Sequence, residues 1–127
     1  MTRSATALKR SPPVPVLPTE PRPSRTRPVD LVFLSQKTGG DRQIERDVLA
    51  LLRSQVALII QRAPHATRDE VRQMACAIRG AGRHVGAFAV AESAAELCLA
   101  GDDRYAAAYA IFMDELATTA HFLKSLD

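Results

Sequence analysis

The sequence predicts an all-α protein, namely an antiparallel up-down four-helix bundle that follows a short N-terminal helix and a disordered N-terminal tail. Apolar residues recur three or four positions apart from Asp41 onward, as on one face of a helix. No segment alternates as a strand would, and aromatic residues make up only 5% of the 127 residues, which disfavours a β-sandwich or barrel. Four helical segments joined by short loops are typical of such a bundle.

Residues 1–28 form a basic, proline-rich segment that holds seven of the eight prolines. Proline fixes φ and lacks the backbone N–H, so we expect an extended, disordered tail. Six basic residues against one acid give the tail a net charge of +5, whereas residues 29–127 carry 11 basic and 13 acidic residues, a net charge of −2. Without aromatic side chains to stack on bases, the tail is interpreted as a solvated linker, with a nucleic-acid-associated protein as an alternative. The globular domain is therefore predicted over residues 29–127.

Glycine and proline residues that interrupt helices set the predicted ends of the first two helices of that domain. An apolar run from Val29 to Gln36 stops before Gly39 and Gly40, which predicts a brief capping helix. The next helix starts at Asp41 and must end before Pro64, because the residue preceding a proline is pushed out of the α region. Its predicted apolar stripe comprises Ile44, Val48, Leu51, Leu52, Gln55 and Ile59.

The remaining helices are placed by their caps. Thr67 and Glu70 have the spacing of a capping box, so a helix is predicted from Thr67 to about Val85, stopping at Gly86. A short alanine-rich helix over 89–99 follows and is closed by Gly101. Asp102 is then expected to cap a final helix that continues through residue 126. The apolar side of this last helix comprises Tyr105, Tyr109, Phe112, Leu116, Ala120 and Leu123.

The helix over 67–85 has an unusual outer face. At about 100° per residue, Cys76 points directly away from the apolar stripe of this helix. That stripe comprises Val71, Met74, Ile78, Ala81 and Val85, and around Cys76 lie Arg72, Arg79, Gly80 and Arg83. Because a glycine inside a helix costs about 1 kcal/mol relative to alanine, the outward Gly80 suggests that another backbone or a bulky ligand approaches closely. A solvated basic face with tolerated glycines is the alternative.

The segment from Met74 to Phe88 resembles the motif of histidine-containing phosphotransfer (Hpt) domains. In that family the helix carries a histidine, any residue, Leu or Ile, Lys or Arg, a glycine, two small residues, and then an aliphatic residue and a glycine near its end. The matching positions are Ile78, Arg79, Gly80, Ala81, Gly82, Val85 and Gly86. The resemblance extends more weakly over residues 29–127. It implies a four-helix bundle of bacterial two-component signalling that works in a cytoplasmic phosphorelay with a response-regulator receiver domain or a histidine kinase.

Cys76 stands where that family carries its phosphorylated histidine. A thiol that accepts phosphate needs a dedicated site to activate the thiolate and bind the phosphate, and this helix surface resembles none. His65, His84 and His121 are interpreted as ordinary surface histidines rather than replacements, and their spacing does not suit a metal site. Gly39-Gly40 lacks the lysine of a phosphate-binding loop. We therefore expect a non-enzyme with no catalytic residue, cofactor or metal.

The leading hypothesis is an Hpt-like binding module that engages a receiver domain or a histidine kinase without carrying phosphate. Its expected partner-binding residues are Arg72, Arg79, Gly80 and Arg83, which offer a basic strip to an acidic receiver pocket. No stretch approaches the roughly 20 apolar residues of a membrane span, so no membrane partner is expected. A generic helical interaction domain is a further alternative.

A second hypothesis, of a different class, is a reactive-thiol or redox sensor. Three arginines on the same helix face would favour the thiolate of Cys76 and make it more nucleophilic. Cys98 follows Leu97 on the short helix and is interpreted as a small core residue that does not resolve Cys76. Two cysteines are not a disulfide framework, and their number favours a reducing compartment.

Overall fold

The computed structural model describes residues 27–126, and these residues fold into helices alone. The elements are α1 (Leu31–Lys37), α2 (Arg42–Arg62), the 3-10 turn η1 (Ala63–His65), α3 (Arg68–Val85), α4 (Phe88–Leu99) and α5 (Asp102–Ser125). The all-α class is thus confirmed. The predicted disordered tail, apart from its last two residues, lies outside the described residues. None of the described helices combines the length and the apolarity that crossing a membrane requires.

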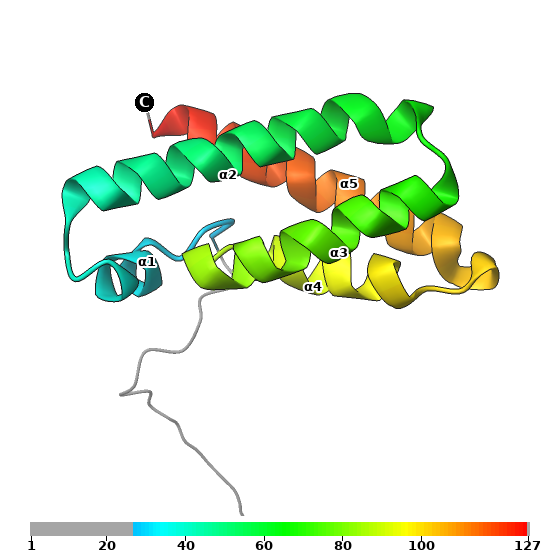
Figure 1. Ribbon diagram of the computed structural model, residues 1–127, viewed down its shortest axis with the longest axis horizontal. Helices are drawn as coiled ribbons and strands as arrows, with labels where there is room; N and C mark the ends of the chain where they lie inside the picture. The colour runs from blue at the N-terminus through cyan, green and yellow to red at the C-terminus, as the bar shows by residue number, and fades with distance from the viewer. Residues whose placement is uncertain (1–26, 127) are drawn as a thin grey trace, which may run out of the picture.

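Figure 1 shows α2 and α3 at the front of the molecule, with α4 and α5 behind them and α1 at one end. Successive long helices run in alternating directions, and α3 packs on α4, α4 on α5, α5 on α2 and α2 on α3. The four helices thereby enclose a single apolar core. Its most fully buried members include Leu52, Val56, Val71, Leu97, Phe112 and Leu116.

The segment that precedes α1 is hydrogen-bonded to the C-terminal end of α3. Val29 is completely buried, and the backbone N–H of Asp30 donates to the carbonyl of Gly86 over 2.9 Å. The Asp30 carboxylate accepts from the Phe33 N–H and caps α1, and the rings of Phe33 and Phe88 meet edge to face at 5.0 Å. The predicted short helix therefore forms, as Leu31–Lys37, and covers the end of the bundle where α3 turns into α4.

α2 has the predicted ends but a different apolar stripe. The Asp41 carboxylate caps its first turn, and the helix ends before Pro64. The buried residues of α2 are Leu52, Val56 and Ile59. The assignment of Ile44 and Leu51 to the core is wrong, because their side chains are 47% and 60% exposed. Both lie on the same side of α2, next to the side that carries the buried residues and not on it.

α3 begins and ends as its caps predict. Thr67 and Glu70 form a complete capping box, and Gly86 ends the helix in the left-handed region with φ of 88°. A Cβ at Gly86 would lie 2.9 Å from the Asp30 carbonyl oxygen, so the turn needs glycine on both counts. The buried residues are Val71, Ala75, Ile78 and Gly82, so the core face is rotated slightly toward α4 from the predicted stripe.

The start of α5 differs from the prediction. Gly101 occupies the N-cap position without any side-chain hydrogen bond, and Asp102 is the first residue of the helix rather than its cap. The Asp102 carboxylate instead accepts from Arg72 of α3. A capping role was wrong because a guanidinium from another helix, which the local sequence does not show, uses that carboxylate. The core side of α5 comprises Tyr105, Phe112, Leu116, Thr119 and Leu123.

Candidate functional site

Cys76 is exposed on the outward side of α3, as predicted, but it is not a free thiol. It forms a disulfide with Cys98 of α4, and the Cα atoms of the two residues are 5.2 Å apart. Cys98 is half-buried and packs against the core, yet it also bonds to Cys76. The interpretation of Cys98 as a residue that does not resolve Cys76 is therefore wrong. The expectation of a reducing compartment, drawn from the number of cysteines, stays a prediction.

The sequence signal for this pairing was the turn between the two helices. Cys76 precedes Gly86 by ten residues, and Cys98 follows it by twelve. In an antiparallel helix pair, residues at similar distances from the turn lie opposite each other. Gly82 and Ala91 face each other by the same relation, since a Cβ added at Gly82 would lie 3.3 Å from the Ala91 Cβ.

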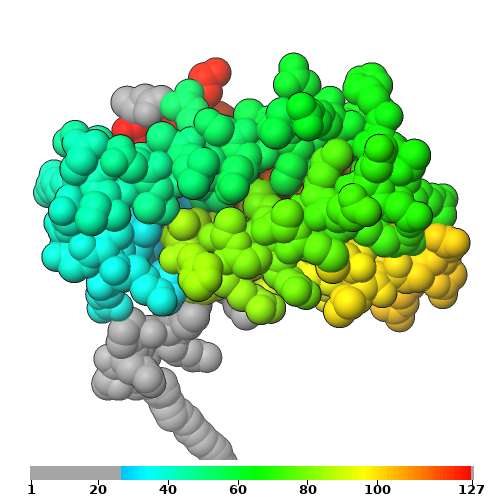
Figure 2. All heavy atoms as spheres, viewed as in Figure 1, coloured from blue at the N-terminus to red at the C-terminus, as the bar shows by residue number. Residues whose placement is uncertain are grey.

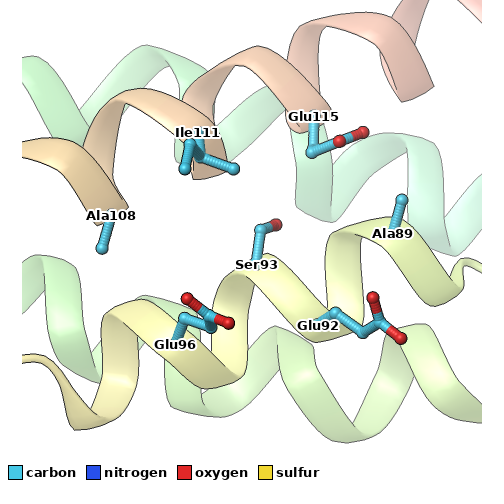
Figure 3. Close-up of a pocket in the computed structure, with 7 residues that line it drawn as sticks. All are labelled: Ala89, Glu92, Ser93, Glu96, Ala108, Ile111 and Glu115. Atoms are coloured by element: carbon cyan, nitrogen blue, oxygen red, sulfur yellow. The ribbon is translucent and has the colours of Figure 1, made fainter.

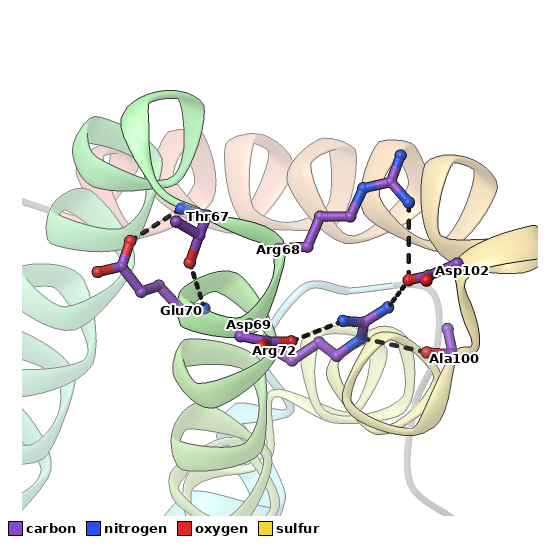
Figure 4. Close-up of polar contacts among 7 residues, drawn as sticks. All are labelled: Thr67, Arg68, Asp69, Glu70, Arg72, Ala100 and Asp102. Carbon is purple, nitrogen blue, oxygen red and sulfur yellow. Dashed lines mark hydrogen bonds and ion pairs between the residues drawn. The ribbon is translucent and has the colours of Figure 1, made fainter.

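Arg72 is a structural link rather than a free docking cation. Its Nε donates to the Ala100 carbonyl at 3.1 Å, and its two terminal nitrogens donate to Asp69 at 3.0 Å and Asp102 at 2.8 Å (Figure 4). Its side chain is only 20% exposed. The hydrogen bond between Arg72 and Asp102 lowers the pKa of the Asp102 carboxyl and raises the pKa of the Arg72 guanidinium. The residue therefore joins α3 to the connection between α4 and α5.

Tyr105 forms the apolar base of this arginine cluster. The guanidinium carbon atoms of Arg68 and Arg72 lie 4.7 Å and 5.1 Å from the centre of its ring, within the range of cation–π attraction. Arg68 also lies 3.7 Å from the Asp102 carboxylate. Burial raises the pKa of the Tyr105 phenol, so its side chain stays neutral across the physiological range. The cluster fixes the N-terminal end of α3 to the start of α5.

The other three predicted partner-binding residues remain available. Gly80 is exposed, and a Cβ added there would meet no atom within 4 Å. Arg83 is exposed and Arg79 is half-exposed, and neither side chain forms an ion pair with any residue in the described part of the chain. The outward side of α3 thus presents bare backbone at Gly80 between two unpaired cations, one turn beyond Cys76.

An apolar stripe on α2 is left exposed, although two of its three members, Ile44 and Leu51, were assigned to the core from the sequence. Ile44, Leu51 and Leu58 recur seven residues apart, and their side chains are 47%, 60% and 44% exposed. At its end the stripe borders a shallow groove between α2 and α3 lined by Gln55, Leu58, Ile59, Met74, Ala77 and Ile78. We call the α2 stripe and the outward strip of α3, with Ala77 between them, the α2–α3 face; Figure 2 looks onto these two helices. The seven-residue spacing could have identified the stripe.

A second groove, between α4 and α5, has the opposite chemical character. Glu92 and Glu96 of α4 and Glu115 of α5 line it around the buried Ser93, whose hydroxyl donates to the Val90 carbonyl (Figure 3). These carboxylates do not converge as metal ligands would, and no group of His, Cys, Asp or Glu among the described residues is arranged to hold a metal ion. The groove is acidic where the outward side of α3 is basic.

The three histidines are exposed, as predicted. His65 lies in η1, His84 lies in the last turn of α3, and His121 lies on α5. None of them lies within a turn of Cys76 on α3, since His84 follows it by eight residues, about 12 Å along the helix axis. No histidine therefore replaces Cys76 on the outward side of α3. No family model, no curated protein and no solved structure matches the chain.

Proposed function

We propose that α2 to α5 form an up-down four-helix bundle of the Hpt kind, and that the protein is a phosphorelay-type binding module. In this proposal it binds a receiver domain of a response regulator, or a histidine kinase, in the cytoplasm and does not pass phosphate on. The observation that carries the proposal is the composition of the α2–α3 face. This face combines the exposed apolar stripe of α2, the bare backbone at Gly80 and the unpaired Arg79 and Arg83 of α3.

Each part of the face suits a receiver domain for a physical reason. Exposed leucines supply the apolar centre that a stable interface needs. Gly80 lets a partner approach the α3 backbone without meeting a side chain. Arg79 and Arg83 complement an acidic phosphorylation pocket, and such complementarity speeds association and orients the partners. Arg72 is not part of this face, because its N–H groups are bound to Ala100, Asp69 and Asp102.

The absence of phosphotransfer follows from the atom at position 76. A phosphoryl acceptor must offer a lone pair to phosphorus, and a histidine nitrogen offers one at neutral pH. The Cys76 sulfur is instead bonded to Cys98 and cannot act as a thiolate nucleophile while that bond lasts. We therefore propose a module that occupies or biases its partner and is not itself an enzyme.

The test is binding to a panel of purified receiver domains, measured by calorimetry with the wild type and with matched variants. Leu51→Glu and Arg83→Glu, both on the α2–α3 face, are expected to weaken binding at least tenfold. Ile111→Glu and Arg104→Glu serve as controls, because both residues are exposed on α5. Equal losses from the α5 variants, or no binding by any receiver domain, would refute the proposal and leave a generic helical interaction domain.

A further inference from the structure

The contact between α3 and α4 is held at three places along its length. At one end Gly82 packs so closely on α4 that an added Cβ would lie 3.2 Å from the Ala87 carbonyl oxygen. At the other end Arg72 donates to the carbonyl of Ala100. The Cys76–Cys98 disulfide lies between these two attachments. Two of these three attachments, the Gly82 packing and the Arg72 hydrogen bond, hold α3 and α4 together without the disulfide.

We propose that Cys76 and Cys98 are a reversible thiol–disulfide pair that exchanges with low-molecular-weight thiols and their disulfides. This inference rests on the geometry of α3 and α4 and not on the proposed binding function. Disulfides needed for folding are typical of small domains without a sufficient core, whereas this domain buries a core from all four long helices. Exposed disulfides are the labile and regulatory ones.

The two sulfurs differ in access, which sets the order of the reaction. Cys76 is exposed, whereas Cys98 is half-buried against the core. An incoming thiolate therefore attacks the Sγ of Cys76, the bond between Cys76 and Cys98 breaks, and the Cys98 sulfur leaves as a thiolate that takes a proton from water. A second external thiol then attacks the external sulfur of this mixed disulfide. The products are the Cys76 thiol and the oxidised external disulfide, so two electrons pass from the external thiols to the protein.

The reverse reaction is favoured by the same fixed backbone. After reduction, the Gly82 packing and the Arg72 hydrogen bonds still hold α3 and α4 together. The Cα atoms of Cys76 and Cys98, 5.2 Å apart, already lie within the usual range for a disulfide. The Cys76 thiolate attacks an external disulfide and releases one external thiolate, which leaves a mixed disulfide at Cys76. The neighbouring Cys98 thiolate then attacks the Cys76 Sγ and expels the second external thiolate, because an intramolecular attack has a high effective concentration. Oxidation should close the pair rather than stop at a mixed disulfide.

The redox state changes the chemistry of the outward side of α3. In the oxidised protein the Cys76 sulfur is tied to α4 and carries no proton or charge. In the reduced protein the Cys76 thiol lies about one helical turn from Gly80 and from the unpaired Arg79. The pair thus adds or removes a nucleophile at one place on the surface while the helices keep their positions.

The test is equilibration of the native protein with mixtures of reduced and oxidised glutathione, followed by alkylation and mass measurement of the intact chain. The expected result is two interconverting species, with either no thiol or both thiols alkylated, and the same helical circular dichroism for both. Cys98→Ser should accumulate the glutathione mixed disulfide at Cys76. Cys76→Ser should react more slowly, because the Cys98 sulfur is less exposed.

Arg72→Leu tests whether the hydrogen bonds of Arg72 keep Cys76 and Cys98 close enough to re-form the disulfide. Loss of its bonds to Ala100 and Asp102 should shift the equilibrium toward the reduced form on the order of tenfold, the size expected for a charge-assisted hydrogen bond. An unchanged equilibrium in this variant, with helix content retained, would contradict the role given to the backbone. Unfolding of the wild type on reduction, disulfide-linked dimers, or a wild-type mixed disulfide as abundant as in Cys98→Ser would overturn the proposal.

Discussion

The two sides of α3 differ in how they meet their neighbours. On the α4 side, the buried Gly82, the Cys76–Cys98 disulfide and the hydrogen bond from Arg72 to Ala100 join α3 to α4 along most of their contact. On the α2 side, Met74 and Ala77 line a shallow apolar groove, and the leucines of α2 stay exposed beside it. We conclude that α3 is attached mainly to α4, whereas the α2 side leaves apolar surface exposed. Substitutions on the two sides should therefore act on different quantities.

The largest expected effect is the loss of the disulfide from the closed side. The double variant Cys76→Ala/Cys98→Ala should lose about 3 kcal/mol of unfolding free energy, because the bond no longer restricts the loop between the two residues in the unfolded chain. The sequence separation of 22 residues sets that loop. Urea unfolding of the wild type and the double variant measures the loss, with the reduced wild type as the control. No difference between oxidised wild type and variant would contradict a stabilising bond.

The two glycines of α3 provide a matched pair with opposite signs. Gly82→Val should cost on the order of 1 to 3 kcal/mol, because its side chain overpacks the contact with Ala87 and Ala91. Gly80→Ala should instead stabilise the protein by about 1 kcal/mol, the difference in helix propensity, because its Cβ meets open space. Thermal unfolding of both variants tests this. A Gly80→Ala variant that is less stable than the wild type would show that the outward side of α3 is not open.

The ion pair between Arg72 and Asp102 should give a smaller, pH-dependent effect. Because Arg72 lowers the folded-state pKa of Asp102, the pair contributes stability above the unfolded-state value, about pH 4. That contribution is lost as the pH falls through the lower pKa of the folded state. The stability difference between the wild type and Asp102→Asn should therefore be largest near neutral pH and disappear in acid.

Asp103→Asn is the control for that series, because Asp103 lies on the same turn without an arginine partner among the described residues. The stability difference between the wild type and Asp103→Asn should not show this dependence on pH. A difference for Asp102→Asn that stays constant from neutral to acidic pH would mean that the carboxylate charge contributes nothing to the link between α3 and α5.

The smallest effect on stability is expected on the open side. Leu51→Glu should change the unfolding free energy by no more than about 0.5 kcal/mol, because the Leu51 side chain is 60% exposed and packs little. Urea unfolding of Leu51→Glu beside Ile111→Glu measures this change for two similarly exposed residues on different helices. A large loss of stability in Leu51→Glu alone would show that the α2 stripe belongs to the core after all.

The sequence could predict what depends on neighbours along the chain. The capping box of Thr67 and Glu70, the helix end at Gly86 and the stop before Pro64 are local, and the structure confirms all of them. The errors share another cause. The partner of Cys98, the bonds of Asp102 and the exposure of Leu51 depend on which helix lies opposite and how it is rotated.

The same limit applies to the candidate site. The outward position of Cys76 and the open backbone at Gly80 follow from one helix and its periodicity, and both are confirmed. Arg72 has the same periodicity but is bound by residues about 30 positions away in the sequence. On α3, periodicity therefore predicted which side chains leave the core but not which of them a neighbouring helix then binds.

The most direct test of the proposed function is a phosphotransfer assay with receiver domains carrying a radiolabelled phosphoryl group. Three chains are compared: the wild type, Cys98→Ala, and the double variant Cys76→His/Cys98→Ala, in which an imidazole nitrogen replaces the sulfur on the outward side of α3. If the proposal is correct, label is expected on the double variant alone, because the wild type then lacks only the acceptor atom. Label on the wild type, or no label on a correctly folded double variant, would contradict it.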